Sequence, residues 1–344
     1  MPTTTSSALP ANARAWHLTA RPEGWPSPDG FALREVPIAP PGPGQIAVRN
    51  LSISVDPYMR GRMNDVPSYL PPFRLDEPMD GGAVGVVVAS AADDIAVGDH
   101  VEHPIGWRDY AVVDAQVANR VDPAVAPLSA YLGVLGMTGL TAYLGLTRIA
   151  GLRAGETVFV SGAAGAVGSQ VGQIARLRGA SRVIGSAGSA EKVRLLTEEY
   201  GFDAAFNYKD GPVIEQLRQA APDGIDVYFD NVGGDHLEAA IERINTHGRI
   251  AVCGMIGRYN ATEAPAAPRN LHQIILKRLR VEGLLVRDHP DLRNQFIAEA
   301  TGWLRDGSLR YHETVVHGLE NAVDAFLGML RGDNIGKMVV KLEH

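Results

Sequence analysis

The segment SGAAGAVGSQVGQIARLRGASRVIGSAGSAEK, residues 161–192, places a glycine-rich turn between a strand-like run and a helical pattern. A turn that binds phosphate needs exposed backbone N–H groups and little side-chain bulk, which favours glycine. The order of strand, turn and helix therefore predicts that the turn binds the diphosphate of a dinucleotide. A turn that is rich in glycine only for packing is the alternative interpretation.

The turn departs from the pattern G-x-G-x-x-G at one position. Ala163 replaces the first glycine, and Gly162 precedes it. We expect Gly165 to let the main chain approach the diphosphate, and Gly168 to let the helix pack closely on the strand. The expected cofactor contacts in this turn are Gly162, Ala163, Ala164, Gly165, Ala166, Val167 and Gly168.

The end of the second strand-like run indicates which dinucleotide binds. NAD sites usually carry an acidic residue there, which binds the ribose hydroxyls and would repel a 2′-phosphate. This chain instead continues with Gly188 and Ser189 and then Lys192, a set of small donors and one ammonium that suits a phosphate dianion. Glu191 should point about 100° away on the helix. We predict NADPH/NADP+ as the cofactor; a solvated Lys192 paired with a neighbouring acid is the alternative.

The periodicity of the whole chain predicts an α/β protein. Its 344 residues suggest two domains. Six short apolar runs alternate with helical patterns between 156 and 286, which is typical of a doubly wound parallel sheet of the Rossmann type. Residues 1–128 are rich in proline, glycine and β-branched runs and predict a β-rich, partly closed barrel. We expect domains at 1–128 and 129–306, with 307–344 returning to the first.

Composition excludes several classes of protein. The net charge of −7 and the lack of a basic block argue against a nucleic-acid partner. The chain has no run of about 20 apolar residues that could span a membrane. Its first residues lack the basic and apolar regions of a signal peptide, so we expect a cytoplasmic protein. Cys253 is the single cysteine, which rules out an intrachain disulfide.

Several stretches along the chain resemble one known family. They are SVDPYMRGRM (54–63), MTGLTAYLGL (137–146), the glycine turn, YFDNVGG (228–234) and GDNIGKMVV (332–340). The chain resembles the zinc-independent medium-chain dehydrogenase/reductases, most of all the leukotriene B4 dehydrogenase and prostaglandin reductase group with its double-bond and curcumin reductases. The resemblance spans nearly the whole chain and implies a Rossmann domain inserted into a GroES-like substrate and catalytic domain.

The resemblance also implies contacts with the cofactor. It places residues 163–166 under the diphosphate, and Lys192 at the 2′-phosphate with Tyr208 beside it. The other implied contacts lie mostly along the nicotinamide: Asn231, Cys253, Gly254, Met255, Ile256, Tyr259, Leu284, Leu285, Val286 and Asn334. Milder interpretations remain open. Asn231 could cap a helix, Tyr208 could end a strand, Asn334 could serve a turn, and Cys253 could be a buried, unreactive thiol.

We expect no metal site. Residues 1–128 contain no cysteine, and His100 and His103 would face opposite sides of a strand. This directs the expected chemistry away from alcohol oxidation. The hypothesis is that hydride from NADPH adds to the β-carbon of an α,β-unsaturated ketone or aldehyde, so that the C=C bond is reduced. NADPH-dependent quinone reduction and non-catalytic NADPH binding are the competing functions.

A hydrogen-bond donor should stabilise the enolate that such a reaction forms. The candidates are Tyr259, just past the fifth strand of the sheet, and Tyr58, which the resemblance places near the nicotinamide. Each could instead be a packing aromatic, and a ribose hydroxyl or water could supply the proton. Leu276 stands where some relatives have a further tyrosine, so their substrates do not carry over directly. The resemblance also implies a homodimer that pairs near residues 281–286.

Overall fold

The computed structural model describes residues 9–263 and 266–343, and the chain divides into two compact units. Unit 1 runs to Leu132 and also takes in Thr314–Asp333 and the chain from Met338. Unit 2 comprises Gly133–Glu313 and Asn334–Lys337. The division after residues 128 and 306 stays a prediction about functional domains, because the two units are defined by contacts alone.

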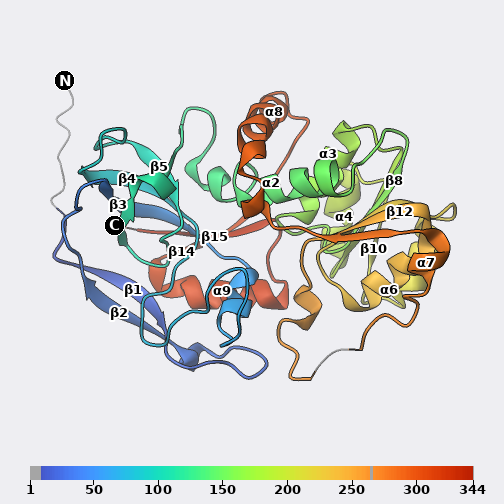
Figure 1. Ribbon diagram of the computed structural model, residues 1–344, viewed down its shortest axis with the longest axis horizontal. Coiled ribbons are helices and arrows are strands. Elements are labelled where there is room, and N and C mark those ends of the chain that lie inside the picture. The colour runs from blue at the N-terminus through green and yellow to red at the C-terminus, as the bar shows by residue number, and fades with distance from the viewer. Residues whose placement is uncertain (1–8, 264–265, 344) are drawn as a thin grey trace. The chain divides into compact units, whose positions relative to one another are not determined.

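Unit 2 is built on a six-stranded sheet in the order β10-β9-β8-β11-β12-β13, and each pair of neighbouring strands is parallel. Figure 1 labels β8, β10 and β12 of this sheet. The strands are β8 (Thr157–Val160), β9 (Arg182–Ala187), β10 (Ala204–Asn207), β11 (Ile225–Asp230), β12 (Ile244–Val252) and β13 (Arg280–Gly283). This confirms the predicted doubly wound parallel sheet, because the order reverses at β8 as it does in dinucleotide-binding folds.

The helices of unit 2 alternate with these strands, as the helical periods predict. They are α2 (Met137–Leu144), α3 (Gly168–Leu177), α4 (Ala190–Glu198), α5 (Val213–Ala220), α6 (Gly234–Arg243), α7 (Gln273–Lys277) and α8 (Arg293–Arg305). Helix α3 buries Val171 and Ile174 on one face, and its Gly172 leaves room for the ring of Phe202. None of the helices in the described chain is both long and apolar enough to cross a membrane.

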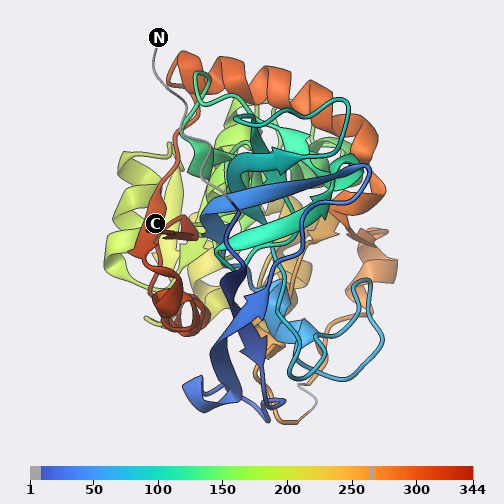
Figure 2. The ribbon, with the colours of Figure 1, turned by 90° about the vertical axis from the view of Figure 1, so that its left-hand side faces the viewer.

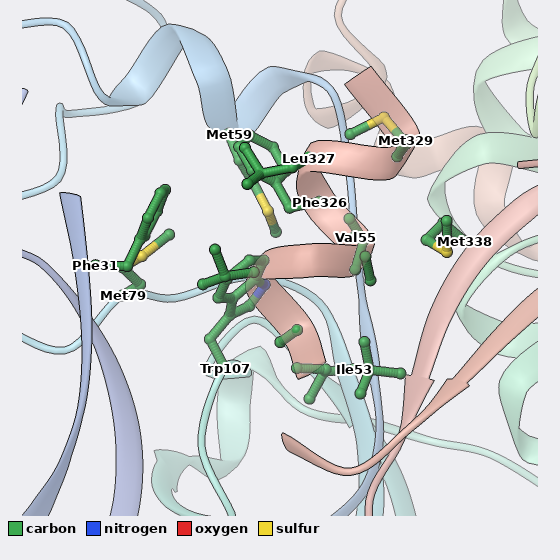
Figure 3. Packing of buried hydrophobic residues seen from close by; sticks show 14 of the residues in the cluster. Phe31, Ile53, Val55, Met59, Met79, Trp107, Phe326, Leu327, Met329 and Met338 are labelled. Carbon is green, nitrogen blue, oxygen red and sulfur yellow. The ribbon is translucent and has the colours of Figure 1, made fainter. Parts of the chain in front are cut away.

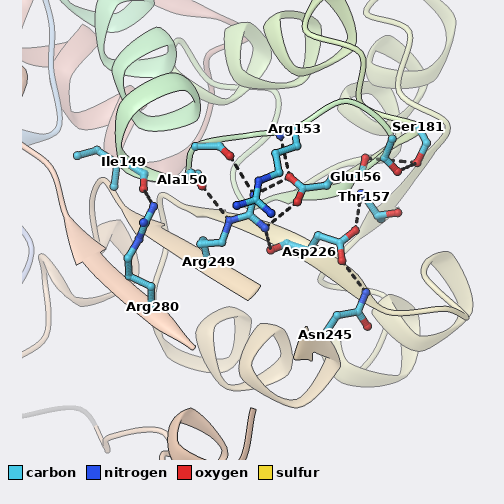
Figure 4. A network of polar contacts seen from close by, with 12 residues as sticks. Ile149, Ala150, Arg153, Glu156, Thr157, Ser181, Asp226, Asn245, Arg249 and Arg280 are labelled. Carbon is cyan, nitrogen blue, oxygen red and sulfur yellow. Dashed lines mark hydrogen bonds and ion pairs between the residues drawn. The ribbon is translucent and has the colours of Figure 1, made fainter. Parts of the chain in front are cut away.

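An ion-pair network ties the amino-terminal side of this sheet together (Figure 4). The Arg249 guanidinium binds Glu156 with two hydrogen bonds, 2.9 Å from Nη1 to Oε1 and 2.5 Å from Nη2 to Oε2. Arg249 also donates to the carbonyl oxygens of Ala150 and Gly151, at 2.9 and 3.1 Å. The pair joins β12 to the residue just before β8, on the side of the sheet away from the strands' carboxyl ends.

Unit 1 is rich in strands (Figure 2). Its larger sheet runs β14-β15-β3-β4-β5-β7, with β6 also paired to β3, and β1 and β2 form a separate antiparallel pair. The strands are β1 (Asn12–Leu18), β2 (Phe31–Pro37), β3 (Gln45–Ser54), β4 (Ala83–Ser90), β5 (His100–His103), β6 (Tyr110–Asp114), β7 (Asn119–Arg120), β14 (Glu313–His317) and β15 (Lys337–Lys341). The sequence predicts strands at 44–55 and 81–90, which correspond to β3 and β4. It also predicts one strand region at 109–121, which a 3-10 turn divides into β6 and β7.

The core of unit 1 forms around Trp107 (Figure 3). Its ring meets that of Phe326 edge-on, with centroids 6.1 Å apart, and its Nε1 donates to the carbonyl oxygen of Ser54 at 3.1 Å. Phe326 comes from helix α9 (Ala322–Arg331), and Met59 from the short helix α1 (Tyr58–Arg62). The C-terminal helix therefore completes the core of the N-terminal strands.

His103 of β5 is buried in unit 1 as a neutral ring. Its Nε2 lies 2.8 Å from Asn50 Oδ1, and its Nδ1 accepts the backbone N–H of Ile105 at 3.2 Å. Burial, assisted by the nearby charge of Arg108, lowers the pKa of His103 to about 3. The folded protein therefore keeps this ring neutral at pH values where an unfolded chain protonates it.

We expect the stability of unit 1 to fall as the pH drops from about 6.5 towards 3. Unfolded histidine takes up a proton near pH 6.5, so each further pH unit favours the unfolded chain by about 1.4 kcal/mol. Thermal unfolding of the wild type and of a His103→Gln variant, at pH 7 and pH 5, checks this. The wild type should lose about 2 kcal/mol more than the variant. Equal losses in the two proteins would contradict the assignment.

Candidate functional site

The predicted cofactor residues of unit 2 follow the carboxyl ends of its strands. Because all six strands are parallel, these ends lie at one edge of the sheet, where open α/β sheets bind ligands. The residues that follow β8, β9, β10, β11, β12 and β13 begin at Ser161, Gly188, Tyr208, Asn231, Cys253 and Leu284. The fold therefore brings to one edge a set of residues that are scattered over more than a hundred positions of the chain.

The glycine turn between β8 and α3 is tightly built. Gly162 has a φ of +57°, a left-handed conformation that favours glycine. A Cβ on Gly168 would lie 2.7 Å from the Cα of Ala163 and well inside contact distance of the Gly162 carbonyl oxygen. Only glycine fits there without a backbone shift. The turn therefore leaves the start of α3 free of side-chain bulk, as a phosphate cradle requires.

The structure explains why alanine is tolerated at position 163. A Cβ on Gly185 of β9 would lie 2.9 Å from the Ala163 Cβ, so the missing side chain on β9 makes room for the alanine methyl group. Ala163 is fully buried, and its N–H donates to the Ser186 carbonyl oxygen at 2.9 Å. A glycine inside a strand pattern signals such a close approach, so Gly185 was the clue in the sequence.

Gly165 meets the C-terminal segment of unit 2. It forms a parallel bridge with Gly336, whose N–H donates to the Ala164 carbonyl oxygen at 2.9 Å. Asn334 Nδ2 in turn donates to the Gly336 carbonyl oxygen at 2.7 Å. The N–H of Gly165 itself bonds to the Gly162 carbonyl oxygen at 3.1 Å, so this glycine serves the shape of the turn. The bridge between Gly165 and Gly336 therefore places Asn334 near the glycine turn. The Asn334 side chain also stabilises the turn at residues 334–336.

The residues predicted for the 2′-phosphate gather after β9 and β10. Ser189 caps helix α4, and its Oγ accepts the backbone N–H of Lys192 at 3.3 Å. Tyr208 is 40% exposed and lies against Gly188: a Cβ on that glycine would be 3.1 Å from the Tyr208 Oη. Lys192 is half-buried in the first turn of α4, and Glu191 is exposed. Strand β9 ends at Ala187 without an acidic side chain. The corner formed by Gly188, Ser189, Lys192 and Tyr208 is therefore suited to a phosphate.

Asn231 and Tyr259 lie where β11 and β12 end. Asn231 donates from Nδ2 to the Ser161 carbonyl oxygen at 2.8 Å and does not cap α6, whose N-cap is Gly233. A Cβ on Gly254 would lie 3.3 Å from the Tyr259 Oη and 3.8 Å from the Asn231 carbonyl oxygen. The hydroxyl of Tyr259 therefore points towards the ends of these two strands, where the nicotinamide is expected.

Asp230 is a site residue that the sequence analysis did not identify. It is fully buried, and its Oδ1 accepts hydrogen bonds from Tyr228 Oη at 2.7 Å, Gly233 N at 2.8 Å, Val232 N at 3.0 Å and Ser161 Oγ at 3.2 Å. One carboxylate thus joins the start of the glycine turn to the loop that holds Asn231. An acidic residue at the end of an apolar strand was the available signal.

Cys253 directly follows β12, and its backbone N–H donates to the Asp230 carbonyl oxygen at 2.9 Å. Burial, with the Asp230 carboxylate nearby, raises the pKa of the Cys253 thiol to about 12. The thiol therefore stays protonated at neutral pH, which agrees with the interpretation of an unreactive cysteine. Met255 and Ile256, next along the loop, are half-buried.

The segment after β13 lies beside the end of β12. Leu284 is buried and donates its N–H to the Val252 carbonyl oxygen at 3.2 Å, while Leu285 and Val286 are half-buried. Leu276, in contrast, is 61% exposed on α7. Residues 284–286, which are expected to flank the nicotinamide, therefore lie next to the end of β12.

Tyr58 belongs to unit 1, where it begins helix α1 and packs against the core around Trp107. Burial and the nearby Asp56 raise the pKa of its hydroxyl above the ordinary value, so the hydroxyl keeps its proton. Arg60 bonds to Asn64 Oδ1 at 2.8 Å, and Arg62 pairs with Asp80. Both arginines therefore make stabilising contacts within unit 1.

His100 and His103 do not converge on a metal site. His103 is buried and His100 half-buried, three positions apart on one strand. Among the residues that the structure describes, no three His, Cys, Asp or Glu side chains are grouped so as to hold a metal ion.

Two family models match the chain. The first, the N-terminal domain of oxidoreductase, matches residues 14–121, and the second, zinc-binding dehydrogenase, matches residues 166–301. The first covers most of the strands of unit 1, and the second covers the parallel sheet apart from β8.

Relatives match over nearly the full length. A putative NADP-dependent oxidoreductase of Bacillus subtilis is 45% identical over 97% of this chain and 99% of its own. The NADPH-dependent curcumin reductase of Escherichia coli is 42% identical over 96% of both chains. The NADP(+)-dependent 2-alkenal reductase of Nicotiana tabacum is 42% identical over 92% of this chain and 94% of its own.

A solved structure matches as well. The crystal structure of CurA from Vibrio vulnificus in complex with NADPH superposes with a TM-score of 0.92 at 42% identity, covering 96% of this chain and 99% of that one. This agrees with the fold, the glycine turn and the sequence stretches described above. The chain therefore belongs to the medium-chain dehydrogenase/reductases, in the zinc-independent group that contains the curcumin, prostaglandin and alkenal reductases.

Proposed function

We propose that this protein uses NADPH to reduce the C=C bond of α,β-unsaturated ketones and aldehydes and leaves the carbonyl group intact. The observation that carries the proposal is the full-length similarity to an NADPH-dependent curcumin reductase and an NADP(+)-dependent 2-alkenal reductase. The corner formed by Gly188, Ser189, Lys192 and Tyr208 supports the choice of NADPH, because β9 ends there without an acidic residue.

The residues of unit 2 fit such a cofactor. The glycine turn, with its left-handed Gly162 and its closely packed Gly168, would hold the diphosphate. Lys192 and Tyr208 would bind the 2′-phosphate, and the loops after β11, β12 and β13 would hold the nicotinamide. When bound, NADPH supplies the hydride that the β-carbon of the substrate receives.

The protein's own contribution to the reaction is a hydrogen bond to the carbonyl oxygen of the substrate. Negative charge builds on this oxygen as the enolate forms, so a donor placed there lowers the barrier by about 3 kcal/mol. Tyr259 is the first candidate, because its hydroxyl points to the strand ends beside Gly254. Tyr58 is the second, because its hydroxyl keeps its proton. Either phenol is a weak acid that can share its proton without losing it at neutral pH.

Replacing Tyr259 with phenylalanine should lower kcat for enone reduction by about 150-fold, which corresponds to the loss of about 3 kcal/mol from one such donor. The KM for NADPH should change less than twofold, because the substitution removes only the hydroxyl group and keeps the aromatic ring. Steady-state kinetics would measure both values. Tyr131→Phe is the matched control, since that hydroxyl bonds the Asp122 carbonyl oxygen at 2.9 Å in unit 1. A Tyr259→Phe variant with full kcat would remove this residue from the donor role.

The function is tested by following NADPH and NADH oxidation with enones, enals, quinones and alcohol/NADP+ pairs. We expect saturated ketones or aldehydes as products and a preference for NADPH. Faster turnover of quinones would favour quinone reduction instead. NADPH binding without turnover of any substrate would identify a non-catalytic NADPH-binding protein.

We also propose that the protein is a cytoplasmic homodimer. Strand β13 is an edge of the parallel sheet and is exposed along its whole length. Val281 of this strand is 42% exposed, and Ile275 of α7, the helix that precedes it in the chain, is 78% exposed. An exposed edge strand with apolar neighbours is suited to pairing with a second copy around a twofold axis. Sedimentation equilibrium would reveal a mass of 36.7 kDa or twice that, and cell fractionation would test the location.

A further inference from the structure

His236 is a buried residue that packs against Tyr208, one of the residues expected to bind the 2′-phosphate. It lies near the start of α6, where its backbone N–H donates to the Gly233 carbonyl oxygen at 3.2 Å. Its ring meets the ring of Tyr208 edge-on, with centroids 5.4 Å apart and the planes at 74°. His236 is 4% exposed, whereas Tyr208 is 40% exposed. The histidine therefore forms the inner support of a tyrosine whose outer side reaches solvent.

The contact between these rings is made by an uncharged imidazole. Burial lowers the pKa of His236 to about 4, although the carboxylates of Asp230 and Asp235 act in the opposite direction. An edge-to-face pair of this geometry contributes about 0.5–1.5 kcal/mol beyond the area that it buries. The histidine thus holds the tyrosine by packing and brings no positive charge of its own at neutral pH.

Tyr208 is also confined on its other side. A Cβ on Gly188 would lie 3.1 Å from the Tyr208 Oη and 3.2 Å from its Cε1, so the phenol lies close against this glycine. The backbone N–H of Tyr208 donates to the Ala187 carbonyl oxygen at 3.1 Å, which fixes the start of the side chain. The ring therefore lies between the loop after β9 and the first turn of α6.

We propose that His236 is a positioning residue for coenzyme selectivity, which holds the Tyr208 ring against Gly188 so that the phenol hydroxyl is presented to the 2′-phosphate of NADPH. This inference rests on the proposed cofactor site. NADH lacks the 2′-phosphate, so its binding should not depend on where the hydroxyl of Tyr208 lies. His236 should therefore affect the two coenzymes differently, although it is expected to touch neither.

The test measures the dissociation constants of NADPH and NADH by fluorescence titration, without substrate, for the wild type and four variants. His236→Ala should weaken NADPH binding about fivefold, in line with the loss of one ring contact, and change NADH binding less than twofold. His236→Phe keeps an aromatic edge and should stay within twofold of the wild type for both. In a Tyr208→Ala background, adding His236→Ala should have no further effect, because the two residues act as one unit.

Equal weakening of NADPH and NADH by His236→Ala would overturn the proposal and leave His236 as part of the general packing of α6. A full additional loss in the Tyr208→Ala background would overturn it too, because the histidine would then act by another route. If His236→Ala does not fold in thermal unfolding experiments, His236→Leu fills the space without an aromatic ring and takes its place. A wild type that binds NADH as tightly as NADPH would instead contradict the proposed cofactor, and the failure to reduce any enone would leave these titrations unaffected.

Discussion

Replacing Lys192 with glutamate is expected to lower kcat/KM for NADPH by about 100- to 1000-fold and to change that for NADH less than threefold. A charge-assisted hydrogen bond to phosphate is among the stronger polar contacts in proteins, and reversing the charge adds repulsion, so a loss of about 3–4 kcal/mol is reasonable. Each 1.4 kcal/mol corresponds to a factor of ten. Lys192 lies in the first turn of α4, next to the capping Ser189, and the ends of β9 and β10 meet at the same corner.

Arg194→Glu is the matched control for this experiment. Arg194 is exposed on the same helix, two positions further on, so the substitution makes the same change in net charge. It should lower kcat/KM for NADPH less than threefold. Similar losses in both variants would mean that the general field of the protein, and not a contact at Lys192, sets the preference. An unchanged ratio of NADPH to NADH in Lys192→Glu would contradict the assignment directly.

Replacing Arg249 with alanine is expected to lower the free energy of unfolding by about 3 kcal/mol, because it leaves the mostly buried Glu156 carboxylate with the Arg153 N–H but without its charged partner. The two side chains are only 12% and 16% exposed, so solvent cannot easily take over the role of the guanidinium. The carbonyl oxygens of Ala150 and Gly151 also lose a donor. Denaturant unfolding followed by circular dichroism would measure the loss.

Arg218→Ala provides the comparison. Its pair with Glu215 lies on the surface of α5, with side chains 51% and 55% exposed, and should contribute less than about 1 kcal/mol. The Arg249 network lies away from the carboxyl ends of the strands, so NADPH binding by folded Arg249→Ala should remain within twofold of the wild type. A loss of binding without a loss of stability would show that the network reaches the site.

The parallel sheet could be predicted because its signals are local. Buried parallel strands appear as short apolar runs. The pattern of residues 213–220 predicts a helix, and α5 has these same bounds in the structure. The sequence does not predict strands β1, β2 and β14. Strands β2 and β14 have few buried residues, and the buried residues of β1 include two alanines and a histidine, so the hydrophobic pattern of all three is weak. Their pairing comes from tertiary contacts that no short window of sequence contains.

The same distinction holds for the candidate site. The glycine turn and Lys192 lie within one stretch of sequence, so spacing alone could identify them. Asp230 and His236 could not be found in this way, because their roles depend on partners from other strands. The Asp230 carboxylate meets Ser161, which follows β8, and the His236 ring meets Tyr208, which follows β10. The position of a residue in a motif does not show which residues of other strands and loops it contacts.

The bridge between Gly165 and Gly336 has a consequence for dissecting this protein. Although residues 133–313 are continuous and contain all six parallel strands, the neighbour of the glycine turn comes from residues 334–337. An excised fragment that ends at residue 313 would therefore present an open flank beside the very loop expected to bind the diphosphate. A minimal nucleotide-binding fragment therefore needs residues 334–337 as well, for example joined to residue 313 through an engineered linker. Truncation of the chain at residue 313 would not give such a fragment.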